Sequence, residues 1–121
     1  MKKYNKIILI ALLTTLASTT CLADGNTLLT QCRSAMKLLD GDNNLDKSEV
    51  LDAGQCMGYI KGTTASFKMF KLHNTCWPES GPSTAQAARI VFKYISDNPA
   101  KLHEPEILVS ALALNQAFPC M

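Results

Sequence analysis

The sequence predicts an all-α fold, a small disulfide-stapled bundle of four main helices. Apolar residues recur every three or four positions in four separate segments, which is the spacing of amphipathic helices. No segment shows the alternation of apolar and polar residues that is typical of a half-buried strand. The chain has five cysteines, and Cys32 and Cys56 lie within the first two of these segments, so a disulfide can cross-link the helices.

Residues 1–23 are expected to be a cleavable signal peptide. Three lysines precede an apolar run over residues 7–13, and the small residue Ala23 offers a cleavage site. A charged head, a short apolar core and a small residue before the cut are the parts of a secretory signal. The run is shorter than the roughly 20 residues that span a bilayer. We therefore expect residues 24–121 to form a single domain in the periplasm, with no membrane segment after cleavage.

The net charge changes when the signal is removed. The whole chain has a formal charge of +2, but Lys2, Lys3 and Lys6 lie in the signal, and acidic residues outnumber basic ones in the rest. A nearly neutral domain gives no electrostatic reason to bind nucleic acid or anionic lipid. We therefore expect no nucleic-acid partner.

The cysteines form an even set once Cys21 leaves with the signal, and an even set in an oxidising compartment predicts disulfides. No Cys-x-x-Cys pair and no histidine at ligand spacing accompanies them, so we expect no structural zinc site. Four cysteines allow three pairings. We favour Cys32 with Cys56, which would join the first two helices, and Cys76 with Cys120, which would anchor the chain end.

The first helix is expected to begin at residue 26 or 27 and to end at Leu39, before the acidic turn from Asp40 to Asn44. This turn resembles the start of a calcium-binding EF-hand loop. However, Leu45 and Leu51 stand where that loop needs glycine and glutamate. We expect a solvent-exposed connector and no metal.

Capping-box patterns predict where the next two helices begin: Asp46 with Glu49, and Ser83 with Gln86. The second helix is expected over residues 47 to about 72, and the third ends near residue 97. Between them lies an irregular loop in which prolines and glycine prevent helix formation. The fourth helix begins at Pro105 and stops before the proline at residue 119.

The second helix carries Gly54, Gly58 and Gly62 at every fourth position, with Ser66 next in the series. Each internal glycine costs up to about 1 kcal/mol relative to alanine, so three in register suggest that another backbone approaches closely. Two interpretations stay open. The favoured one is a helix crossing within the chain, and the other is a face for self-association.

The sequence contains no recognisable set of catalytic residues. Cysteines in disulfides leave no thiol nucleophile, and His73 and His103 have no serine or paired acid at a motif spacing. The helical glycines do not form a phosphate-binding loop. The residues alone therefore predict a binding or inhibitory module that is not an enzyme and has no cofactor.

Several local patterns occur together in a specific order. They are a cysteine in the first helix, QCMGYIKG, CWP, VFKYISDNPAKLHEP and a terminal LALNQAFPC. In this order and spacing, the chain resembles the Rap/Tai family of periplasmic immunity proteins, which protect bacteria against peptidoglycan amidase effectors of the type VI secretion system. The acidic turn lies outside the pattern, and Trp77 stands where an aliphatic residue is more usual.

The resemblance implies a small, helical, non-catalytic protein that binds a peptidoglycan amidase effector and blocks access to its active site. Some members of the family act as dimers, so a homodimer is also implied. The alternative from a different class is a small periplasmic helical chaperone or stress-related binding protein. It would expose apolar surface after acid-induced dissociation.

We expect the partner to contact the loop after the second helix and the exit from the third helix, because a cross-linked loop loses little entropy on binding. The candidate partner-binding residues are His73, Asn74, Trp77, Glu79, Ser80, Lys101 and His103. Trp77 fits equally well as a core residue beside its disulfide.

Overall fold

The computed structural model describes residues 23–71 and 75–121. The predicted signal, apart from Ala23, and the candidates His73 and Asn74 lie outside the described residues. The described part is helical and contains no strand. Its elements are α2 (Gly25–Leu39), α3 (Lys47–Phe70), α4 (Thr84–Asp97), the short 3-10 helix η2 (Pro99–Lys101) and α5 (Glu106–Ala117). The predicted all-α bundle of four main helices is confirmed.

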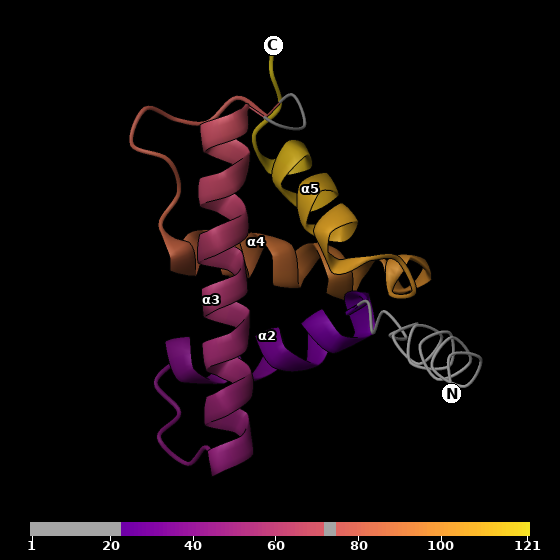
Figure 1. Cartoon of the computed structure of the whole chain (residues 1–121). Coiled ribbons are helices and arrows are strands. Elements are labelled where there is room, and N and C mark those ends of the chain that lie inside the picture. The colour runs from indigo at the N-terminus through magenta and orange to yellow at the C-terminus, as the bar shows by residue number, and fades with distance from the viewer. Residues whose placement is uncertain (1–22, 72–74) are drawn as a thin grey trace, which may run out of the picture.

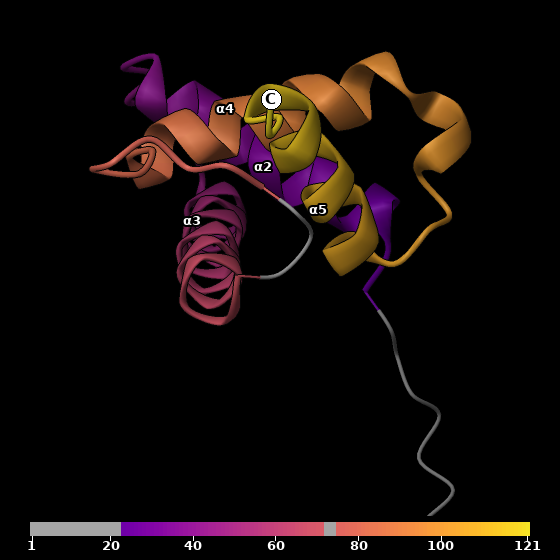
Figure 2. The same ribbon diagram turned by 90° about the horizontal axis from the view of Figure 1, so that it is seen from above.

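The longest helix, α3, lies across two others. In Figures 1 and 2, α2 and α4 cross α3 at a steep angle on the same side of it, and α5 runs beside α4. Tyr59 of α3 and Ser110 of α5 share a hydrogen bond of 3.2 Å, which ties the two helices together. One face of α3 is therefore covered, and the opposite face has no helix against it in these views.

A single apolar core lies where the four helices meet. On α3, its members fall on one side of the helix, because they are spaced by three or four residues. These are Ala53, Cys56, Ile60, Thr63 and Phe67. The largest fully buried side chains from all four helices are Phe67, Leu28, Ile60, Ile95, Leu114, Val91 and Val109.

Polar side chains cap the starts of three helices. Asp46 accepts hydrogen bonds from the backbone N–H of Ser48 (2.8 Å) and Glu49 (2.9 Å). The Glu49 side chain accepts one from Asp46 N (3.1 Å), which completes the predicted capping box. Ser83 accepts from Gln86 N at the start of α4 (3.1 Å). The first helix begins at Gly25, slightly earlier than expected, because Asp24 caps it.

The capping carboxylates make the stability of the domain depend on pH. Hydrogen bonds from the backbone N–H of Glu49 and from Ser48 lower the pKa of Asp46 below its usual 3.8. A carboxylate with a lowered pKa stabilises the fold above its unfolded pKa, and this stabilisation is lost as the pH falls through the folded pKa. We expect the melting temperature to fall as the pH drops below about 4.

Asp46→Asn provides the matched control for this pH dependence. Asparagine caps helices about as well as aspartate but does not titrate. The melting temperature of the variant, followed by circular dichroism, should therefore fall less steeply with acid than that of the native protein. Identical acid profiles for the two proteins would contradict a role of Asp46 in the pH dependence.

Two disulfides cross-link the fold with the favoured pairing. Cys32 of α2 is bonded to Cys56 of α3, with a Cα–Cα distance of 5.0 Å, and both residues are fully buried. Cys76 in the loop is bonded to Cys120 near the chain end, with a Cα–Cα distance of 4.9 Å. The first disulfide belongs to the core, whereas the second lies at the surface.

The backbone at the start of α2 is hydrogen-bonded to the segment that follows α4, residues 98–104, which we call the exit from α4. Gly25 N donates to Glu104 O (3.0 Å), and Asn26 N donates to Leu102 O (3.0 Å). A Cβ atom on Gly25 would lie only 2.9 Å from the Cα and O atoms of Leu102. The two backbones can approach this closely because residue 25 has no side chain.

The favoured interpretation of Gly54, Gly58 and Gly62 was wrong. A Cβ atom placed on any of the three would have nothing within 4 Å, apart from the backbone of its own helix turn and adjacent residues. All three glycines are exposed. The core residues of α3 occupy the opposite side of the helix, so no described element crosses α3 at its glycines.

Candidate interaction surfaces

The loop before α4 is held firmly at its base. Cys76 N donates to Phe118 O (3.0 Å), and the Thr75 hydroxyl donates to the Asn115 side chain. The ring of Trp77 packs on the ring of Phe118, with centroids 5.4 Å apart. Trp77 is partly buried against the core, and its buried indole N–H has no acceptor among the described residues. This position favours Trp77 as a core residue beside its disulfide over Trp77 as a partner-binding residue.

The tip of this loop is available to a partner. Gly81 N donates to Pro78 O (2.8 Å), which closes a tight turn, and Gly81 has a positive φ of 71°. Glu79 and Ser80 lie in the turn with exposed side chains. These two residues therefore stay candidates for binding.

The exit from α4 offers the other candidate segment. Lys101 is partly buried in η2, and His103 is exposed, with its Nε2 atom 3.7 Å from Glu104 Oε1. The contact of Leu102 with the start of α2 fixes this segment in place. The exit from α4 is therefore held in place by backbone hydrogen bonds and exposes the imidazole of His103.

The two candidate segments do not form one surface, because they lie at opposite ends of α4 (Figure 1). A helix of 14 residues is about 21 Å long. A partner that contacts both segments must therefore extend along α4.

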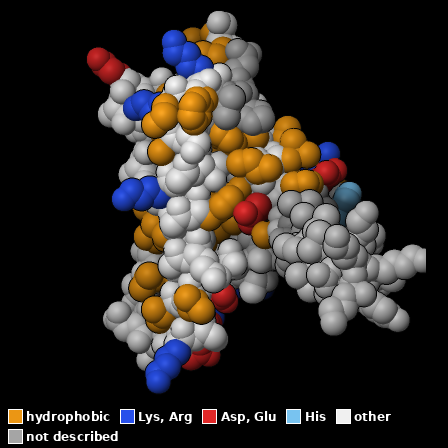
Figure 3. Space-filling view, in the orientation of Figure 1, with side chains coloured by type: hydrophobic (Ala, Val, Ile, Leu, Met, Phe, Trp, Pro, Cys, Tyr) orange, Lys and Arg blue, Asp and Glu red, His pale blue; other side chains and the backbone are white. Residues whose placement is uncertain are grey.

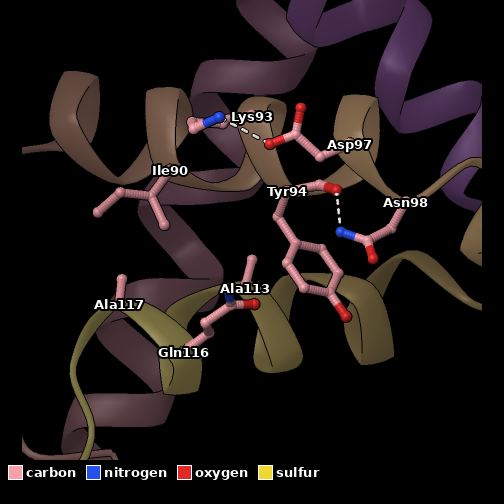
Figure 4. Close-up of a pocket in the computed structure, with 8 residues that line it drawn as sticks. All are labelled: Ile90, Lys93, Tyr94, Asp97, Asn98, Ala113, Gln116 and Ala117. Atoms are coloured by element: carbon pink, nitrogen blue, oxygen red, sulfur yellow. Dashed lines mark hydrogen bonds and ion pairs between the residues drawn. The ribbon is translucent and has the colours of Figure 1, made fainter.

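A pocket along α4 lies between these ends. It has a volume of about 420 Å³ and opens between α4 and α5 (Figure 4). Its lining residues are Ile90, Lys93, Tyr94, Asp97, Asn98, Ala113, Gln116 and Ala117. The ring of Tyr94 extends across the gap towards α5. The pocket combines an apolar floor with a charged edge, which suits a side chain from another protein.

Two internal contacts lie along the α4 side of the pocket. Lys93 Nζ lies 2.7 Å from Asp97 Oδ2, and Asn98 Nδ2 donates to Tyr94 O (2.8 Å) at the end of α4. The sequence alone does not predict this pocket. Its only signal is the pair Ala113 and Ala117, four residues apart, which places two small side chains on the same side of α5.

The outer face of α3 is a third exposed surface. We define it as the small residues Gly54, Gly58, Gly62 and Ser66 with the large apolar residues Leu51 and Met69. The side chains of Leu51 and Met69 are 62% and 73% exposed. In Figure 3, white atoms run along the middle of α3, and orange side chains lie near both ends.

Comparison with known families decides what kind of protein has this fold. A model of the Rap1a immunity proteins matches residues 24–120, which include all four main helices and both disulfides. The chain belongs to the Rap1a immunity protein family. No curated protein and no solved structure matches it. The family assignment confirms the resemblance found in the sequence.

Two carboxylates of the acidic turn make contacts within this Rap1a domain. Asp40 pairs with Arg89 of α4 (2.7 Å), and Asp42 accepts a hydrogen bond from Asn44 N (2.9 Å). The described residues contain no group of three His, Cys, Asp or Glu side chains that could hold a metal ion. Among the described helices, none is long and apolar enough to cross a membrane.

Proposed function

We propose that residues 24–121 form a periplasmic immunity protein that binds a peptidoglycan amidase effector of a type VI secretion system and blocks its active site without catalysis. Membership of the Rap1a immunity family is the observation that carries this proposal. The family match begins at residue 24, directly after the predicted cleavage site, which supports export of the domain.

The pocket between α4 and α5 is the surface that we assign to the effector. It lies between the two candidate segments, and Asn98 belongs both to the pocket and to the exit. Binding energy in protein interfaces concentrates in a few side chains that fill well-packed pockets. A single effector side chain in the pocket, with the exit beside it, would provide such an anchor.

Co-purification of the exported domain with candidate amidases, followed by measurement of cell-wall hydrolysis, tests the function. We expect a stable complex and loss of hydrolysis. A strain that lacks the gene should become susceptible to the matching amidase. The proposal fails if no amidase binds and the susceptibility of the deletion strain is unchanged.

The surface is tested by filling the pocket. Ala117→Leu adds bulk to an exposed lining residue and should weaken the amidase complex at least about tenfold, a loss of about 1.4 kcal/mol. Ser96→Leu is the matched control, because Ser96 is exposed on the same region of α4 but does not line the pocket. Equal affinities of the two variants, measured by calorimetry, would assign the effector to another surface.

A further inference from the structure

A second pocket lies between α3 and the start of α4. It has a volume of about 190 Å³ and shares no lining residue with the pocket between α4 and α5. In Figures 1 and 2, the loop that leads into α4 passes beside the C-terminal half of α3. No acidic side chain lines this pocket. The residues that give it its polar character, with the glycine of the loop, are Lys61, Thr64, Lys68, Ser80, Gly81 and Thr84.

Two lysine side chains give the pocket its charge. Lys61 and Lys68 are seven residues apart, so they lie on the same side of α3, two turns from each other. Neither lysine forms an ion pair with any described residue. Lys68 Nζ reaches the turn of the loop, because a Cβ atom built on Gly81 would lie 3.3 Å from it. Two positive charges therefore border a small space that contains no described negative charge.

The start of α4 adds to this positive character. The first N–H groups of a helix have no acceptor within it, and they form the positive end of the helix dipole. Ser83 accepts a hydrogen bond from Gln86 N, whereas the N–H groups of Thr84 and Ala85 have no acceptor among the described residues. Since Thr84 lines the pocket, this end of α4 lies against it.

A buried hydroxyl in the wall of the pocket is without a partner. Thr64 Oγ1 is buried and has no hydrogen-bond partner among the described residues. Thr64 lies between Lys61 and Lys68 on the same side of α3. A buried polar atom without a hydrogen bond costs free energy, so folded proteins seldom leave one unless water or a ligand satisfies it. This observation is independent of the charges, and it indicates that a polar group occupies the pocket.

We propose that this pocket binds a single oxyanion group, of the size of a carboxylate or a phosphate, through the ammonium groups of Lys61 and Lys68 and the hydroxyl of Thr64. Hydrogen bonds between ionised groups are the strongest of their kind. Complete small molecules occupy pockets of roughly 300–1,000 Å³, so the smaller volume here suits one charged group. Both lysines are exposed, so binding should be in the millimolar range and should weaken with salt.

Nuclear magnetic resonance titrations of the exported domain, in its oxidised form, test the site. The domain is titrated with sodium acetate and, separately, with sodium phosphate, while sodium chloride keeps the ionic strength constant. We expect the amide signals of Gly81, Thr84 and Ala85 to shift and to saturate with at least one of the two anions. The more effective anion identifies the group as a carboxylate or a phosphate. The proposal is overturned if neither anion gives saturable shifts, or if chloride alone gives the same shifts.

Removal of one lysine charge should weaken the binding of the more effective anion. Lys61→Gln and Lys68→Gln should each raise its Kd at least about threefold, because an ionic contact is lost. Lys47→Gln is the matched control, since it removes the same charge from an exposed position on the same helix. Position 47 is about 32 Å from position 68 along α3, well beyond the screening length of about 10 Å. Equal affinities of the control and the two pocket variants would overturn the proposal.

Thr64→Val tests the hydroxyl separately. Valine keeps the shape of threonine but cannot donate a hydrogen bond, so this variant should also bind the anion at least about threefold more weakly. Its melting temperature should not fall, because the hydroxyl forms no hydrogen bond with any described residue. An unchanged affinity, with or without a change in the melting temperature, would overturn the assignment of Thr64 to the site.

Discussion

Replacement of Cys32 and Cys56 by alanine is expected to lower the free energy of unfolding by about 3 to 5 kcal/mol. The disulfide closes a loop between residues that are 24 positions apart, so its loss increases the conformational freedom of the unfolded chain. Both cysteines are fully buried in the core, so the variant also loses packing between α2 and α3. Urea denaturation, followed by circular dichroism, measures the change.

The second disulfide provides the comparison. Cys76 and Cys120 are exposed, so replacing both by alanine removes a cross-link but leaves the core intact. We expect the free energy of unfolding of this variant to fall by about 4 kcal/mol, because opening the longer loop gives the unfolded chain more conformational freedom. The packing of α2 on α3 should stay unchanged. Amide hydrogen exchange in α2 and α3 should therefore increase more in the core variant. The same increase in both variants would contradict the separate roles of the two disulfides.

Gly25→Ala is expected to destabilise the domain by about 1 to 3 kcal/mol, because the added Cβ would lie 2.9 Å from the backbone of Leu102. The melting temperature should fall by about 4 to 8 °C for each kcal/mol in a domain of this size. To accept the methyl group, the start of α2 must move away from the exit of α4. The hydrogen bonds of Gly25 and Asn26 to that exit would then lengthen.

Gly54→Ala is the matched control, since the same substitution is made where the helix is uncovered. Alanine inside an exposed helix stabilises it by roughly 0.5 to 1 kcal/mol relative to glycine. The two variants should therefore shift the melting temperature in opposite directions. A loss of stability in both would show that α3 is covered at its glycines after all.

Local signals in the sequence were sufficient to predict the helices. Asp46 and Ser83 act as the predicted caps because capping involves only residues within one helical turn. The expected end of α3 was about two residues late, since the helix ends at Phe70 and Lys71 adopts a left-handed conformation. The disulfide pairing could be predicted once the order of the helices was known.

The surfaces were harder to predict because they depend on how the helices cross. A row of glycines indicates room for a close approach, but the row alone does not say whether the approaching backbone belongs to the same chain. The position of the core residues on the opposite side of α3 decides this point. The α4–α5 pocket depends on the gap between two helices, which Ala113 and Ala117 leave open only when they face Ile90 and Tyr94.

The disulfide pairing also has a consequence for the way the protein matures. The cysteines of the domain are bonded in the order in which they occur along the chain, first Cys32 to Cys56 and then Cys76 to Cys120. A chain that enters an oxidising compartment with its N-terminus first exposes the members of each pair in succession. Oxidation in order of arrival then gives the native bonds directly, provided that Cys21 is removed with the predicted signal. We therefore expect the exported domain of our proposal to need an oxidant but no isomerase to correct its disulfides.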